Sequence, residues 1–544
     1  MGHFLFFLFA VVAGLLWTAA CTAAAARSSR PWLKSLLAAL GTALPVCAVL
    51  PIVAATWWLA FAARIPANWF PQAFTVLVSL LVGGAWIVRA GLTSQDEGDP
   101  PAARWPLIGL IALAAIAAAV TAGVLLILDN AVQAQAPYLR LEAANLMQAN
   151  LPPSVADDEN AAALHLQAGA AIAADEKFSA EGSPLHAEGD VLRDEVTAVL
   201  ARHATTLDLV RRAADHDTCR FARDWSRPSI DMILPEVQDM RNQARLLGLA
   251  ARRAAAEGRH VDALADIVRL QRLGRHAAAE PILISYLVGL AIDRMALVEL
   301  ADLLPRLGDG DAPLLATPEV RDLVDRRIDL LPALYGEEAF GLATFADFTD
   351  GRMTSEGLFT PELAPAPWPI CDTGPIFRVF FLADDITGYR RLMHGAQQLA
   401  ARRVGSASAA GVIREADNLE ATVLENRSGI LSRVLVPTLK HVLQTRARDE
   451  AARRAAAVLV AATKQRLATG ALPLEPTAFA GPTPFVMPAD PFVEGSRLLL
   501  MKRSGAGIAV YSVGLDGADD GGPPPHGEAA EDGNDDVGLV MAVR

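Results

Sequence analysis

The chain has 544 residues, of which 52% are hydrophobic and 6% aromatic, and its formal net charge is −13 at pH 7. This length exceeds what one ordinary core accommodates, so two or three domains are expected, and the alanine- and leucine-rich composition favours helices. The sequence has no lysine- or arginine-rich run of the kind that follows a phosphate backbone, which excludes nucleic acid as a partner.

The first part of the chain is unusually apolar. Four segments without a charged residue lie at 4–26, 36–63, 69–88 and 106–128, and each has at least 20 residues. A helix of this length can cross about 30 Å of hydrocarbon. The sequence therefore predicts a membrane domain at residues 1–130 with four transmembrane helices in contact with membrane lipid.

The loops between these segments predict an orientation. The first and third loops together carry five lysines and arginines, whereas the second carries only Arg64. Because positively charged loops stay on the cytoplasmic side, the first and third loops are expected in the cytoplasm. We therefore expect a multi-pass protein of a cytoplasmic membrane, with everything after residue 130 on the extracytoplasmic side.

Residues 131–430 show apolar positions at helical spacing, interrupted by short breaks. Gly258 separates two such stretches and suits the left-handed residue that ends a helix, which predicts a helical hairpin. The apolar stretch after Pro281 is interrupted by Asp293, Arg294 and Glu299, which favours a buried core helix over a fifth membrane span. This region is predicted to form a large, extracytoplasmic domain of α-helical hairpins.

Common catalytic signatures are missing from the sequence, among them HExxH, the phosphate-binding GxxxxGK[ST] and the GxSxG nucleophile elbow. We therefore predict a protein that is not an enzyme and has no small-molecule substrate. Two short patterns leave a metal open. The segment DHDTC at 215–219 could supply ligands or be a solvated helix end, and His276 and Glu280 share a helix face as ligands or as ordinary surface residues.

Two cysteines, Cys219 and Cys371, lie outside the apolar segments. An extracytoplasmic location permits a disulfide. The bond would require their Cα atoms to lie within about 7 Å, which sequence does not reveal. A Cys219–Cys371 disulfide is therefore a hypothesis, with two free thiols as its alternative.

Residues 431–544 follow a different pattern. A long amphipathic helix over 431–469 precedes three short β-like runs at 497–502, 508–513 and 537–543. This order predicts a small α+β module made of a long helix and a three-stranded antiparallel sheet. The complete expected fold class is mainly α, comprising the membrane domain, the helical domain and this module.

Three segments carry a resemblance, namely ADPF at 489–492, VYSVGLDG at 510–517 and DDVG at 535–538. Together they resemble the C-terminal region of the type II secretion major pseudopilin. The resemblance implies a pilin-like module and one bound calcium ion, with Asp516 as a ligand from the first turn and Asp535 or Asp536 from the second. Calcium takes six to eight oxygens, which such turns can supply. The alternative is a solvated acidic tail.

The chain as a whole resembles an uncharacterised family of bacterial multi-pass membrane proteins, through segments at 159–172, 219–225 and 337–345. This resemblance implies location in the bacterial inner membrane but no activity. We expect a non-catalytic binding or envelope-scaffold protein with a protein partner. The alternatives are an accessory component of a type II secretion or pilus-like system, and an extracytoplasmic hydrolase with an unrecognised site.

Overall fold

The computed structural model describes residues 29–30, 126–175, 178, 191–228, 232, 234–353, 378–379, 382–402, 408–425, 431–435, 439–479, 485–495, 497–505, 507–523 and 535–542. The chain divides into two compact units, Met1–Ala131 and Val132–Arg544. The second unit contains all the helices and strands given below and includes residues on both sides of the predicted boundary at 430.

The structure corrects the predicted membrane architecture. Within the part of the chain that it describes, no helix combines the length and the apolar character needed to cross a membrane. This contradicts the expected four-span fold class and the expected location in the bacterial inner membrane. Even α11 (Leu283–Leu303), which starts apolar, carries Asp293, Arg294 and Glu299, and such charges are costly in hydrocarbon. The four apolar segments themselves lie outside the described residues, apart from 126–128.

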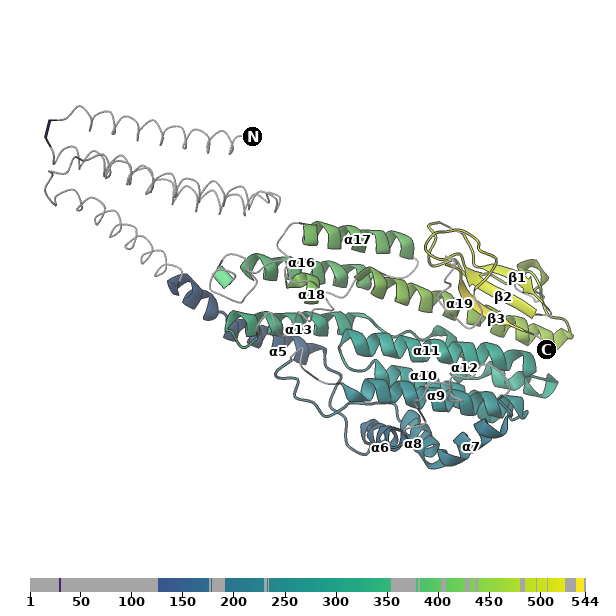
Figure 1. Ribbon diagram of the computed structural model, residues 1–544. Helices are drawn as coiled ribbons and strands as arrows, with labels where there is room; N and C mark the ends of the chain where they lie inside the picture. The colour runs from purple at the N-terminus through teal and green to yellow at the C-terminus, as the bar shows by residue number, and fades with distance from the viewer. Residues whose placement is uncertain are drawn as a thin grey trace, which may run out of the picture. The chain divides into compact units, whose positions relative to one another are not determined.

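The second unit is mainly helical and ends in a small sheet (Figure 1). Several helices begin with proline in the first turn, where its missing N–H costs nothing. In chain order the α-helices are α5 (Ala136–Asn150), α6 (Ala162–Ala173), α7 (Asp194–Arg202), α8 (Ala204–Asp215), α9 (Pro235–Ala256), α10 (His260–Ala277), α11 (Leu283–Leu303), α12 (Pro318–Asp325), α13 (Leu331–Thr349), α16 (Leu382–Ala401), α17 (Ala409–Glu425), α18 (Ser432–Leu435) and α19 (Leu439–Thr469). The 3₁₀ turns are η4 (Leu304–Arg306), η5 (Asp309–Ala316) and η6 (Pro476–Ala478).

Helices α9, α10 and α11 pack against one another at the centre of the unit. Gly258 follows α9 with φ of 76°, so it supplies the left-handed turn expected between α9 and α10. Helices α10 and α11 approach closely at two glycines, since a Cβ built at Gly289 would lie 2.6 Å from the main-chain oxygen of Gly274. Small residues at this crossing allow the backbones to meet.

Helix α19 joins the two largest apolar clusters of the described residues. One cluster contains residues of α6 to α11 together with the C-terminal sheet, and the other contains residues of α11, α13, α16 and α17. The 31 residues of α19 contribute to both, through Ala455 and Leu459 in the first and Val442 and Ala451 in the second. This long helix therefore ties the helical layers to the sheet (Figure 1).

The sheet has the strand order β1-β2-β3, with β1 (Leu500–Ser504), β2 (Gly507–Ser512) and β3 (Val537–Met541). Both pairings are antiparallel, with Leu500 opposite Tyr511 and Ile508 opposite Met541. Every residue of the central strand β2 is buried, and β2 and β3 pack on α19. The mainly helical architecture with a C-terminal, three-stranded antiparallel sheet is thus present as predicted.

A second close approach gives a prediction about stability. A Cβ at Gly336 in α13 would overlap the main-chain oxygen of Pro281, and backbone cannot yield as a side chain can. We expect Gly336→Ala to lower the free energy of unfolding by about 1–3 kcal/mol or more, as overpacked sites do. Denaturant unfolding measures this value, with Gly310→Ala as the control because nothing lies within 4 Å of its Cβ. Equal stability of both variants would contradict the packing.

Candidate functional site

The buried carboxylate of Asp536 connects the two acidic turns of the C-terminal sheet. Its Oδ2 accepts hydrogen bonds from the backbone N–H groups of Asp520, at 3.0 Å, and Gly522, at 2.8 Å. Burial raises the pKa of Asp536, and the negative charges of Asp520 and Asp519 raise it further, against the effect of these two hydrogen bonds. The first turn is therefore fastened to the start of β3 inside a region of negative potential.

The other two predicted calcium ligands are placed differently. The backbone N–H of Asp535 donates to Asp520 Oδ2 at 3.0 Å, and Asp535 Oδ1 lies 3.5 Å from the guanidinium of Arg448. The carboxylate of Asp516 is exposed and accepts the N–H of Ala518 at 2.9 Å within its own turn. The structure thus brings Asp535 and Asp536 to the loop of Asp520, while the carboxylate of Asp516 closes its own turn. Calcium binding stays a prediction.

Two neighbouring aspartates build the frame of these turns. Asp519 accepts hydrogen bonds from Lys502, at 2.7 and 2.8 Å, and from the Tyr511 hydroxyl at 2.8 Å. Asp490, in the ADPF segment, is buried and accepts from Ser512 Oγ at 2.6 Å and from the Val513 N–H at 3.1 Å. The pseudopilin resemblance includes ADPF without giving Asp490 a role. Its buried contacts assign it the role of fixing the end of β2.

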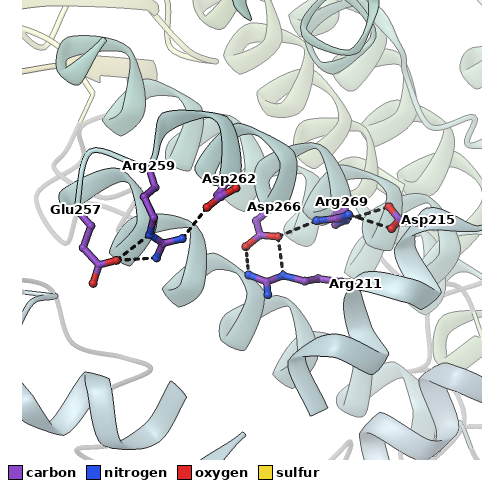
Figure 2. Close-up of polar contacts among 7 residues, drawn as sticks. All are labelled: Arg211, Asp215, Glu257, Arg259, Asp262, Asp266 and Arg269. Carbon is purple, nitrogen blue, oxygen red and sulfur yellow. Dashed lines mark hydrogen bonds and ion pairs between the residues drawn. The ribbon is translucent and has the colours of Figure 1, made fainter. Parts of the chain in front are cut away.

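A network of ion pairs holds α8 against α10 (Figure 2). Asp266 of α10 is 1% exposed. Its two carboxylate oxygens accept hydrogen bonds from Nε and a terminal nitrogen of Arg211 of α8, at 2.9 and 2.6 Å. Arg269 of α10 donates to Asp215, the last residue of α8, at 2.9 and 3.0 Å. Asp215 is therefore engaged in an ion pair, and the DHDTC segment that begins with it is held beside α10.

Cys219, the last residue of that segment, is buried. Cys371 lies outside the described residues, so the disulfide hypothesis stays untested. Within the described residues, the sole place where ligand atoms of three His, Cys, Asp or Glu residues lie within 4.8 Å of one another consists of His165, Cys219 and His276. All three side chains are buried, and they come from α6, the segment after α8, and α10.

The two imidazoles in this group form a chain of short polar contacts. His165 Nδ1 lies 2.7 Å from Gln243 Oε1, and His165 Nε2 lies 3.0 Å from His276 Nδ1. His276 Nε2 lies 3.1 Å from the main-chain oxygen of His216. We call His165, Cys219 and His276 the His–Cys–His cluster.

Burial determines the charge of the cluster. It lowers the pKa of His165 to about 4 and that of His276 to about 3, so both imidazoles are neutral at pH 7. Burial also raises the pKa of the Cys219 thiol, and the nearby carboxylates of Glu280 and Glu236 raise it further. The cluster therefore contains two neutral imidazoles and a protonated thiol.

Sequence patterns indicated part of this cluster. DHDTC contains Cys219. The pattern predicts His276 and Glu280 on one helix face; both side chains are buried, but α10 ends at Ala277, so Glu280 lies beyond the helix. His165 was missed. The signal that could have found it is its spacing, since Ala161, His165, Ala168 and Ile172 share one helical face and all four are buried. A histidine on an otherwise apolar helix face is expected to be buried with that face in the core.

Comparison of the chain with protein-family models, with curated proteins and with solved structures found no match. The resemblances to the pseudopilin and to the bacterial membrane family accordingly stay predictions.

Proposed function

We propose that the protein is a non-catalytic binding or scaffold protein that presents a calcium-stabilised turn to a protein partner. The observation that supports this most directly is the joining of the 514–522 turn to the start of β3 through Asp536. This junction gathers five aspartates, Asp516, Asp519, Asp520, Asp535 and Asp536, in two adjacent backbone segments.

The electrostatics of the junction favour a cation. The negative charges of Asp520 and Asp519 raise the pKa of Asp536, which means that each of them repels the ionised Asp536 carboxylate. The two turns also meet at backbone level, because a Cβ at Gly514, whose φ is 67°, would overlap the main-chain oxygen of Asp535. Carbonyl and carboxylate oxygens at such close quarters are the ligands that calcium prefers.

The packing beneath the turn supports a binding role. Arg294 of α11 donates to the main-chain oxygen of Gly538 in β3 at 2.8 Å, and β3 also packs on α19. The acidic turn therefore projects from an element that is anchored to two long helices. A binding site on a rigid element holds its geometry better than one on a free loop, so less order has to be imposed when a partner binds.

Thermal unfolding of the full chain in calcium and in chelator tests the proposal. An extracellular-type site binds calcium at about 10⁻⁴–10⁻³ M, and a tenfold excess adds about 1.4 kcal/mol of stability. For a unit of this size we expect the melting temperature to rise by about 2 °C, and titration calorimetry should detect the same binding event.

Matched aspartate variants sharpen the test. Asp536→Asn and Asp516→Ala should abolish the calcium response. Asp519→Ala should keep most of it, because Asp519 is paired with Lys502 and Tyr511. Superimposable melting curves in calcium and chelator, with no heat of binding, would show that the junction is a solvated acidic turn.

A further inference from the structure

We propose that the His–Cys–His cluster is a binding site for one transition-metal ion of the Zn²⁺ class, held by His165 Nε2, His276 Nδ1 and Cys219 Sγ. This site is separate from the proposed calcium turn and does not depend on it. It rests on the convergence of three ligand atoms within 4.8 Å of one another and on the hydrogen bonds that surround them.

The outer nitrogens of the two rings determine where their protons lie. His165 Nδ1 faces Gln243 Oε1, and His276 Nε2 faces the main-chain oxygen of His216, so each of these nitrogens must donate. The orientation of the Gln243 amide is set independently, because its Nε2 donates to the main-chain oxygen of His165 at 3.0 Å. Flipping this amide would place two oxygens against each other.

A neutral imidazole has only one N–H, and in each of the two rings the outer contact uses it. The inner nitrogens, His165 Nε2 and His276 Nδ1, then point bare lone pairs at each other across 3.0 Å. Three donating contacts would require a third proton and hence a charged imidazole, which burial in this cluster disfavours. A cation between the two nitrogens removes the repulsion without charging either ring.

The dimensions and the donor set suit zinc. Zinc binds imidazole nitrogen at about 2.0–2.1 Å and thiolate sulfur at about 2.3 Å, so two nitrogens on a tetrahedral ion lie about 3.3 Å apart. The observed 3.0 Å between the inner nitrogens is close to this value. Metal-ligating histidines usually donate their second ring N–H to a carbonyl or carboxylate, which is what Gln243 and His216 provide here.

Cys219 supplies the third protein ligand as a thiolate, and the fourth position of a tetrahedral ion is left to solvent. Binding exchanges the thiol proton for the metal ion, so Cys–SH and M²⁺ yield the Cys–S–M⁺ unit and one H⁺ released to solvent. The buried carboxylate of Glu280 lies four residues after His276, beyond the end of α10. Its Oε2 lies 3.4 Å from Arg223, and its Oε1 has no hydrogen-bond partner among the described residues. Thiolate and imidazole together select zinc-like ions over calcium or magnesium.

Cobalt serves as the probe, because Co²⁺ occupies zinc sites and absorbs visible light there. The full chain should be produced in cobalt-supplemented medium, so that the buried site is filled during folding. We expect about one Co²⁺ per chain, the intense visible absorption of a tetrahedral ion, and a near-ultraviolet thiolate-to-cobalt band.

Variants assign the ligands. Cys219→Ser, which is nearly isosteric, should lose the thiolate band, and His165→Ala and His276→Ala should lower the retained cobalt at least about tenfold. His394→Ala is the control: His394 is an exposed histidine of α16, so this variant should retain the full cobalt content and spectrum.

Far-ultraviolet circular dichroism checks that each variant is folded. If the histidine variants do not fold, the Cys219→Ser spectrum alone decides. A parent protein without tetrahedral cobalt, or a near-ultraviolet band unchanged in Cys219→Ser, would overturn the proposal.

Discussion

Replacing Arg453 by methionine should lower the free energy of unfolding by about 3–5 kcal/mol. The guanidinium is 1% exposed and forms ion pairs with Asp293 of α11 and, at 2.8 Å, with Asp449 one turn away in α19. It also donates to the main-chain oxygen of Leu323 at 3.2 Å. Removing the cation leaves two buried carboxylates without this partner, and the cost of burying their unpaired charge exceeds the packing energy that methionine restores.

Arg259 provides a matched control for Arg453. It too pairs with two carboxylates, Glu257 at 2.6 Å and Asp262 at 2.8 Å (Figure 2). Its side chain, however, is 50% exposed. Arg259→Met should cost no more than about 1 kcal/mol. Combining Arg453→Met with Asp293→Leu should recover part of the loss. Denaturant unfolding measures all three, and an Arg453→Met value within 1 kcal/mol of Arg259→Met would refute the buried-charge account.

Glu299→Gln should flatten the pH dependence of stability between about pH 5 and 8. Burial raises the pKa of Glu299 to about 8, although Arg252 lies 3.2 Å from it and acts in the opposite direction. An unfolded glutamate has a pKa of about 4.3. Between these two values the folded state binds a proton that the unfolded state has lost.

The sign of the effect follows from this difference. The contribution of Glu299 to the free energy of unfolding is fully present below about pH 4.3. It is lost as pH rises to about 8, by up to about 1.4 kcal/mol per pH unit. The parent should therefore lose stability relative to Glu299→Gln as pH rises. Chemical denaturation at pH 5, 6, 7 and 8 measures the difference, and Glu319→Gln, on the exposed face of α12, is the control. Parallel curves for parent and Glu299→Gln would mean that Arg252 keeps the carboxylate ionised.

Local patterns in the sequence determined the secondary structure of the described unit well. Gly258 marked the turn between α9 and α10, because a left-handed residue after a helix is a local requirement. The charges at Asp293, Arg294 and Glu299 indicated a core helix rather than a membrane span, and α11 is such a helix. The β-like runs at 497–502, 508–513 and 537–543 overlap the strands β1, β2 and β3. Each of these signals depends on neighbours within a few residues along the chain.

Composition was a weaker guide where it stood alone. The apolar composition of four long segments predicted a multi-pass membrane protein, yet no described helix meets the requirement for crossing a membrane. An alanine- and leucine-rich helix has the same composition whether it faces lipid or a protein core. In α19 the apolar residues pack into two protein clusters, while Arg453 and Asp449 pair inside them.

Only the tertiary structure brought together the groups that carry chemistry. His165, Cys219 and His276 are separated by 54 and 57 residues and meet because α6, α8 and α10 pack around one core. The sequence already contained His276 and Glu280 at a spacing that suits either a solvated surface or a ligand pair. The choice between these depends on burial, because water satisfies polar groups at a surface, whereas a core forces them to pair with one another or with an ion. Burial depends on which elements pack together, and residues far apart in the chain decide that.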